Sequence, residues 1–198
     1  MLEIPESKTI SIQAGNVLIN KVITGVYPPT DKHKFAFFCG DPREYPKLLT
    51  GRIIKSTDGH GMFVDIQCDK DVCITIGDGT NMRYFAPFEK HPDKHQLLLE
   101  FEDGSFVACT VAMYGGIWAY KGPLDNTYYR GSLNSISPLD DTFNEAYFDG
   151  IFRNTKKDLS LKALLATEQR IPGLGNGVLQ DILFNASLHP RRKKSGTS

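Results

Sequence analysis

A glycine-dense turn, Pro172-Gly-Leu-Gly-Asn-Gly177, constrains the fold of this chain more than any other stretch. Apolar residues recur at helical spacing on both sides of it: Leu161, Leu164 and Leu165 before the turn, and Val178, Leu179, Ile182, Leu183 and Ala186 after it. Ser160 is placed to cap the first helix, and His189-Pro190 ends the second. Such a hairpin leaves backbone N–H groups free where its second helix begins, and these groups and the helix dipole favour a phosphate. The same pattern also fits an ordinary helical hairpin with a glycine C-cap.

Most of the chain before residue 121 alternates short apolar runs with turns, which is typical of β-strands. The runs are Lys21–Val26, Lys34–Phe38, Gly51–Lys55, Met62–Cys68, Asp71–Ile76, Met82–Phe85, Leu97–Phe101 and Phe106–Val111. Glu102-Asp103-Gly104-Ser105 joins the last two runs as a β-hairpin. Ahead of the strands, Pro5 suits the first turn of a helix. We expect a β-sandwich or flattened barrel with an N-terminal helix, and a linker with short helical pieces over 121–159.

Charge is unevenly distributed along a chain whose formal net charge is zero. Residues 151–198 hold nine basic and three acidic side chains, a net of +6, which leaves 14 basic and 20 acidic side chains in 1–150, a net of −6. The basic C-terminal part is therefore the candidate surface for a polyanion. For Arg191–Lys194, a simple solvated charge run is the alternative.

The four cysteines, Cys39, Cys68, Cys73 and Cys109, form no Cys-x-x-Cys pair, so they carry no zinc signature. Three of them lie in strand-like runs, where small buried thiols are common, and we expect a reducing compartment. No signal peptide and no apolar run of membrane-spanning length is recognisable. We expect a cytoplasmic protein.

The two ends of the chain together resemble the formamidopyrimidine-DNA glycosylase and endonuclease VIII family of DNA repair enzymes. Met1-Leu-Glu-Ile-Pro-Glu6 resembles the family's Met-Pro-Glu-Leu-Pro-Glu opening. The turn at 172–177, with His189-Pro190, resembles its helix-two-turns-helix signature, in which glycines and an asparagine grip DNA phosphate. Weaker matches lie between the ends, at Gly61-Met-Phe-Val-Asp65, Gly77, Tyr114-Gly115, Trp118 and Pro138-Leu-Asp-Asp141.

The resemblance implies an α+β fold in two domains. Residues 1–125 would form a β-sandwich of the catalytic type with an N-terminal helix, and residues 126–198 would form the helical helix-two-turns-helix domain. It also implies a monomer that binds double-stranded DNA, damaged or abasic, in association with the nucleoid.

The resemblance further implies a chemistry in which a damaged base is flipped out and the N-terminal amine attacks the sugar. An α-amine has an ordinary pKa of about 7.7–8.0, so part of it is unprotonated near neutrality. Glu3 occupies the position of the carboxyl that opens the sugar ring as general acid and base, and Glu6 would hold the amine. Without that context, Glu3 and Glu6 are two solvated carboxylates.

Several positions depart from the family pattern. Leu2 replaces the nucleophilic proline, and because initiator methionine is normally removed only before small residues, we expect Met1 to carry the free amine. Met62 replaces a phosphate-contacting lysine, and Asp78 replaces a methionine that wedges into DNA. The family's C-terminal zinc finger is absent from these 198 residues, so we expect no metal and no cofactor.

The DNA-contacting residues implied by the resemblance are Asn176, Gly175, Gly173, Lys157 (or Lys156), Met113, Tyr114 and His95. Met113 and Tyr114 lie in Thr110-Val-Ala-Met-Tyr-Gly115, which has lost the family's arginines but retains apolar side chains that can wedge into a base stack. Asn176 can also be a plain turn residue, because asparagine tolerates the left-handed conformation. His95 aligns ambiguously and fits an ordinary surface histidine.

Three functions follow from these observations. The first is a DNA glycosylase with AP lyase activity; the second is a catalytically weak or inactive relative that binds damaged DNA without cutting it. The third is an RNA- or ribosome-associated module, against which the opening Glu3-Ile-Pro-Glu6 argues.

Overall fold

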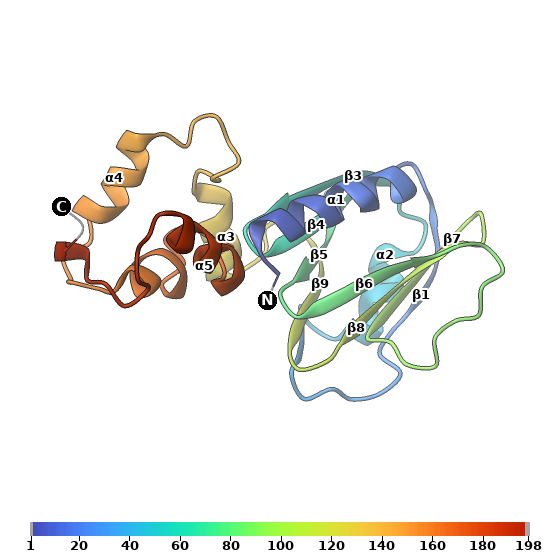
Figure 1. The fold of residues 1–198 in the computed structure, drawn as a ribbon. Coiled ribbons are helices and arrows are strands. Elements are labelled where there is room, and N and C mark those ends of the chain that lie inside the picture. Colours follow the sequence, from blue (N-terminus) through green and yellow to red (C-terminus); the bar gives the residue numbers. More distant parts are fainter. Residues whose placement is uncertain (1, 197–198) are drawn as a thin grey trace. The chain divides into compact units, whose positions relative to one another are not determined.

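A computed structural model describes residues 2–196, which divide into two compact units (Figure 1). The β unit comprises Lys8–Gly59 and Phe63–Leu124. The helical unit comprises the chain up to Ser7, the short segment His60–Met62, and the chain from Asp125 onward. The expected division was 1–125 and 126–198; in the structure, residues 2–7 and 60–62 belong to the helical unit, although they precede its main segment in the sequence. Residues 2–7 belong to the helical unit because Ile4 packs into its apolar core.

The β unit contains two sheets, as expected for a sandwich. One has the order β1 (Ile23–Tyr27), β7 (Leu97–Phe101), β8 (Phe106–Val111) and β6 (Thr80–Phe85), with antiparallel neighbours. The other has the order β2 (Ala36–Phe38), β9 (Gly115–Lys121), β5 (Val72–Gly77), β4 (Phe63–Cys68) and β3 (Ile54–His60). β5 is buried along its whole length, which places it at the centre of the core.

Two features of the β unit were not predicted. One is β9, whose glycines Gly115 and Gly116 weaken the strand pattern in the sequence. The Trp118 ring lies so close to Gly116 and Gly77 that a Cβ atom on either glycine would collide with it. The other comprises η1 (Pro42–Glu44) and α2 (Tyr45–Leu49), a helical stretch too short to show periodicity.

Helix α1 (Ile4–Leu18) begins where the sequence predicts a helix. The Glu6 carboxylate accepts a hydrogen bond from the Glu3 N–H at 2.8 Å, as in the second half of a capping box. Gly15 of this helix makes room for Thr57 of β3, whose hydroxyl donates to the Ser11 carbonyl at 2.7 Å.

The helical unit contains α3 (Thr127–Asn134), α4 (Glu145–Arg153), a π-helical turn η2 (Ala163–Thr167), α5 (Asn176–Asn185) and η3 (Lys194–Gly196). As predicted, Ser160 caps the first helix of the turn motif, because its hydroxyl accepts from the Ala163 N–H at 3.3 Å. The core of this unit is apolar and combines the N-terminus with both motif helices: Ile4, Leu161, Leu164, Leu165, Ala166, Ile171, Leu174, Leu179 and Leu183. No helix among residues 2–196 is long and apolar enough to cross a membrane.

Candidate functional site

Glu3 and the beginning of α5 form the centre of the candidate site. Glu3 Oε1 accepts a hydrogen bond from the Gly177 N–H at 2.9 Å, and Glu3 Oε2 accepts one from the Val178 N–H at 2.8 Å. The sequence predicts free amides here, but two of them are bonded to a carboxylate of the same chain. These amides bind a negatively charged group, as the sequence predicts, since unpaired amides at a helix N-terminus attract an anion.

Backbone contacts hold Glu3 at this place. The Ile4 N–H donates to the Gly173 carbonyl at 3.0 Å, and the Ser7 hydroxyl donates to the Gly61 carbonyl at 3.0 Å. Leu2 is half-buried next to Glu3, whereas Met1, expected to carry the amine, lies outside the described residues. The structure therefore brings together Leu2, Glu3, Glu6 and the glycine-rich turn, which the sequence connects only through the family resemblance.

The turn glycines are required by this tertiary contact. A Cβ atom on Gly175 would collide with the Glu3 carboxylate. Gly173 has φ +78°, and a Cβ atom there would collide with the Gly61 backbone. Both glycines therefore position Glu3 and the 60–62 segment, and their contact with DNA stays a prediction.

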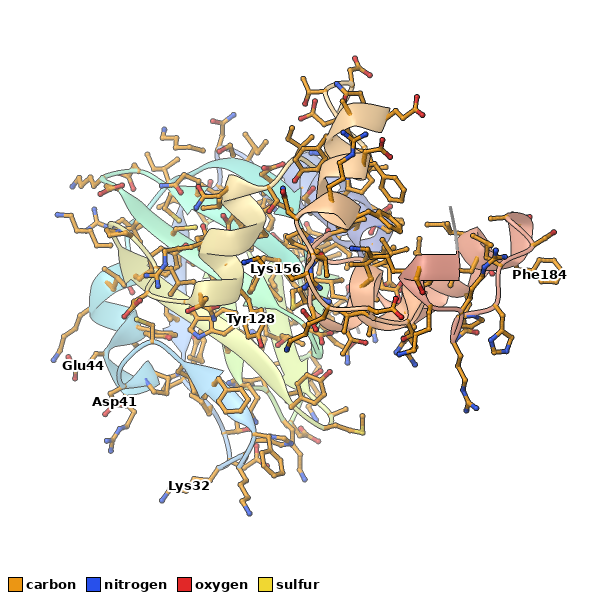
Figure 2. All side chains as sticks on the ribbon, turned by 90° about the vertical axis from the view of Figure 1, so that its left-hand side faces the viewer. Lys32, Asp41, Glu44, Tyr128, Lys156 and Phe184 are labelled. Carbon is orange, nitrogen blue, oxygen red and sulfur yellow. The ribbon has the colours of Figure 1, made fainter. Side chains whose placement is uncertain are left out.

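Asn176 is the first residue of α5, and its side chain is exposed. Within residues 2–196, its carboxamide makes no hydrogen bond. Lys156 and Lys157 are exposed on the segment between α4 and η2, and Figure 2 marks Lys156. These side chains are available to a polyanion.

Met113 and Tyr114 lie between β8 and β9 in the β unit and are 74% and 43% exposed. The Tyr114 hydroxyl donates to Asp78 Oδ2 at 2.9 Å, and this bond raises the pKa of Tyr114. The structure thereby joins two positions that the resemblance assigns separately to wedges in DNA, Asp78 and the Met113-Tyr114 pair. Exposed apolar side chains at this loop are compatible with the predicted wedge.

His95 is not the surface histidine that the sequence suggests. Only 8% of it is exposed, and burial lowers the pKa of its imidazole. It lies two residues before the buried strand β7. A buried ring cannot contact DNA in this conformation, so the prediction for His95 is wrong.

The sequence reasoning missed His60. Its Nδ1 lies 2.7 Å from the Ser132 hydroxyl, and its ring makes an edge contact with Tyr129 at a centroid distance of 5.1 Å. Half-buried Met62 follows two residues later, at the position of the family lysine. The place of His60 directly before Gly61 was the available signal, but the partners come from α3, far away in the sequence.

No group of three or more His, Cys, Asp or Glu side chains suited to a metal occurs within residues 2–196.

No family model matches the chain. Its sequence is 27% identical over 210 residues to a formamidopyrimidine-DNA glycosylase of Oceanobacillus iheyensis, covering all of this chain and 70% of the relative. It is 25% identical over 203 residues to the enzyme of the same name from Geotalea daltonii, covering all of this chain and 71% of that relative.

Solved structures with the same fold include Lactococcus lactis Fpg in complexes with DNA. The complex with abasic-site DNA has a TM-score of 0.82 at 18% identity and covers 99% of this chain and 72% of that one. The complex of wild-type Fpg with DNA containing N7-benzyl-Fapy-dG has a TM-score of 0.81 at 20% identity, and the match covers 99% of this chain and 71% of that one. These likenesses confirm the expected α+β fold and the resemblance to the formamidopyrimidine-DNA glycosylases.

Proposed function

From its relationship to the formamidopyrimidine-DNA glycosylases, we propose that this chain binds damaged duplex DNA, flips out the damaged base and attacks the sugar with its N-terminal amine. The observation that carries the proposal is the Glu3 carboxylate fixed at the start of α5 by the Gly177 and Val178 amides. A positioned carboxyl beside the first residues of the chain is what acid and base catalysis at an N-terminal amine requires.

Glu3 is the general acid and base in this proposal. The amine would bond to the anomeric carbon as the bond to the base breaks, and one amine proton would leave with the base. Glu3 would take the second amine proton and deliver it to the sugar ring oxygen as the bond between that oxygen and the anomeric carbon breaks, which opens the ring and leaves an imine between protein and DNA. The two amides fix the orientation of the carboxylate. Glu6, bonded to the Glu3 N–H, fixes the backbone that leads to the amine of Met1 or, if Met1 is removed, of Leu2.

DNA would be held by the positive, exposed part of the helical unit. The Asn176 carboxamide and Lys157 are exposed there, and phosphate contacts of this kind supply affinity without reading sequence. Met113 and Tyr114 would occupy the place of the extruded base. We further propose that the protein works as a monomer in the cytoplasm, near the nucleoid.

The second candidate function is damage recognition without cleavage. It is favoured by Met62 at the position of the family lysine, because a thioether neither binds phosphate nor transfers a proton. Leu2 at the position of the nucleophilic proline also favours damage recognition without cleavage.

Borohydride trapping on a duplex with one abasic site separates the two functions. The glycosylase and lyase hypothesis predicts a covalent adduct that maps to the N-terminal residue and disappears in Glu3→Gln. Glu145→Gln is the matched control, since Glu145 is exposed in the same unit and has no described hydrogen bond. Salt-sensitive binding with no adduct would leave only damage recognition.

Asn176→Ala tests the DNA contact independently of catalysis. We expect it to weaken binding to all duplexes similarly, by about 1 kcal/mol, because a phosphate contact carries no sequence information. Equal affinities of Asn176→Ala and the wild type in a filter-binding titration would exclude this contact.

A further inference from the structure

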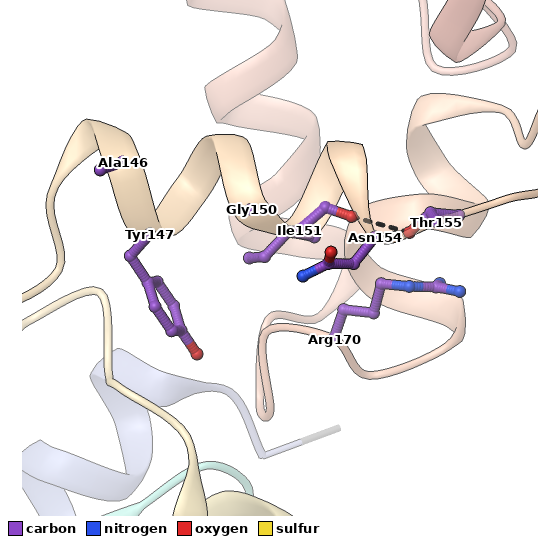
Figure 3. Close-up of a pocket in the computed structure, with 7 residues that line it drawn as sticks. All are labelled: Ala146, Tyr147, Gly150, Ile151, Asn154, Thr155 and Arg170. Atoms are coloured by element: carbon purple, nitrogen blue, oxygen red, sulfur yellow. Dashed lines mark hydrogen bonds between the residues drawn. The ribbon is translucent and has the colours of Figure 1, made fainter.

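A cavity lies within the helical unit, and Glu3 is not among the residues that line it. It has a volume of about 450 Å³. Its lining residues come from α4, from the two residues that follow this helix, and from Arg170: Ala146, Tyr147, Gly150, Ile151, Asn154, Thr155 and Arg170. In Figure 3, Asn154 and Arg170 lie side by side below the end of α4, and Tyr147 stands further back along the same helix. This volume lies in the range of small-molecule sites, about 300–1,000 Å³.

The charges around the cavity are unsuited to a free phosphate. The Arg170 guanidinium is paired with Glu168 at 2.5 Å, so its charge is already compensated. The cavity also adjoins the C-terminal end of α4, where helix carbonyls repel anions. A neutral ligand with hydrogen-bonding edges fits these surroundings better.

Polar groups suited to such a ligand face the cavity. The Asn154 carboxamide offers a donor and an acceptor and, within residues 2–196, makes no hydrogen bond. Arg170 retains donors beyond its pairing with Glu168, and guanidinium groups recognise the O6 and N7 acceptors of guanine.

One wall of the cavity is an aromatic ring in a fixed orientation. The Tyr147 hydroxyl accepts from the Ile136 N–H at 3.3 Å, and its ring packs edge-on against Phe143 at a centroid distance of 5.3 Å. A fixed aromatic ring beside an amide and a guanidinium is a combination that binds nucleobases by stacking and by their edges.

Gln169 connects this cavity to the turn of the candidate site. Its backbone has φ +51°, a conformation rare for residues other than glycine, asparagine and aspartate. Its side-chain oxygen accepts from the Gly173 N–H at 3.0 Å, and its amide donates to the Ala166 carbonyl at 2.7 Å. Arg170 is therefore held at a fixed place relative to the predicted phosphate-binding turn.

We propose that this cavity binds one unpaired purine base of a DNA strand, with guanine preferred, between Tyr147, Asn154 and Arg170. This rests on the proposed function, because a strand held at the neighbouring turn is what presents a base here. It adds a second base-binding site to the chain, separate from the Glu3 site.

Gly150→Leu is the variant that tests the site. Gly150 lines the cavity inside α4, and a Cβ atom there meets nothing within 4 Å, so leucine fills the space without a backbone clash. Replacing a helix-interior glycine also favours the helix, which protects folding. Gly131→Leu is the matched control, since Gly131 lies in α3, has the same free space and does not line the cavity.

The measurement is saturation-transfer NMR of deoxyguanosine, deoxyadenosine and thymidine with the full chain. We expect saturation of the purine H8 in the wild type and in Gly131→Leu, strongest for deoxyguanosine. In Gly150→Leu and Asn154→Ala, we expect binding to be weaker by about tenfold or more. Inorganic phosphate should not displace the nucleoside.

Three results would overturn the inference: no saturation in the wild type, equal saturation in Gly150→Leu, or displacement by phosphate. Abasic-DNA trapping by the same proteins keeps the two proposals apart. Trapping without nucleoside binding removes only the purine site, whereas nucleoside binding without DNA binding or trapping removes the proposed function and leaves a cavity for free purines.

Discussion

At the scale of single residues, the contact between Glu3 and α5 explains why the turn is rich in glycine. Gly175 has an ordinary extended backbone, φ −93° and ψ −176°, so nothing in its conformation demands glycine. Only the Glu3 carboxylate, which occupies the space of a Cβ atom, excludes a side chain. The glycine is thus part of the mechanism that positions Glu3.

Gly175→Ala should therefore destabilise the chain by about 1–3 kcal/mol, because the new methyl group displaces a carboxylate that caps a helix. Urea unfolding followed by circular dichroism measures this. In a Glu3→Ala background, most of the cost should vanish, since the colliding group is gone. An equal cost in both backgrounds would contradict the assigned cause. Gly150→Ala, with open space around it, should instead be neutral or stabilising.

At the scale of elements, α4 is held at its C-terminal end by a residue far along the chain. Lys194 Nζ donates to the Phe152 carbonyl at 2.8 Å and to the Thr155 carbonyl at 2.6 Å. A positive charge near the C-terminal end of a helix also interacts favourably with the helix dipole. The basic run Arg191–Lys194 is therefore structural in part.

Lys194→Met should lower the free energy of unfolding by about 1–2 kcal/mol, because it removes two charge-assisted hydrogen bonds and keeps the apolar stem. Thermal unfolding monitored in the far ultraviolet gives the shift. Arg191→Met is the control for loss of one positive charge, since the Arg191 side chain has no described contact. Equal shifts in both variants would mean that net charge, rather than the cap, is responsible.

The β7–β8 hairpin carries an acid-sensitive contact. Lys21 Nζ donates to Asp103 Oδ2 and to the Ser105 hydroxyl, each at 2.5 Å. The bonds to Asp103 from Lys21 and then from Ser105 lower the pKa of Asp103 to about 2. The stability this provides is fully present above the ordinary pKa of about 3.9 and is lost as pH falls toward about 2.

Asp103→Asn should accordingly remove part of the stability loss between about pH 4 and pH 2 and lower stability at neutral pH. The effect will be small, because the carboxylate is 46% exposed and water screens the pair. Urea titrations of both proteins at steps of pH check it. Parallel pH curves would show that Asp103 does not titrate as assigned.

At the scale of the whole molecule, all four cysteines lie in the β unit, so their reactivity reports the state of that unit alone. Burial raises the pKa of Cys68 and Cys109 to about 12 and that of Cys73 to about 11. Cys39 is exposed. Because the thiolate is the reactive form of cysteine, the buried thiols are protected both by their raised pKa and by their inaccessibility to a reagent.

A thiol-reactive dye should label one cysteine rapidly in the native protein, and Cys39→Ser should abolish this phase. The other three should react only on unfolding of the β unit. Rapid labelling of a second thiol would show that the sheets open more readily than the structure implies.

The sequence by itself determined what depends on neighbouring residues. Pro5 marked the start of α1, and periodicity located both motif helices and eight of the strands. Turn chemistry located the β7–β8 hairpin, and Ser160 was recognised as a cap. The resemblance singled out Glu3 and the glycine-rich turn, but it gave no physical connection between them.

Only the tertiary structure decided which distant groups meet. Glu3 and Gly177 are 174 residues apart in sequence, and periodicity does not encode such a contact. The same holds for His60 with Ser132, for Trp118 of β9 against Gly77 of β5, and for the burial of His95. Local propensity selects helix or strand, whereas the pairing of remote side chains follows from packing of the whole chain. The glycine-rich turn was predicted as an anion site, and the fold placed the chain's own carboxylate there.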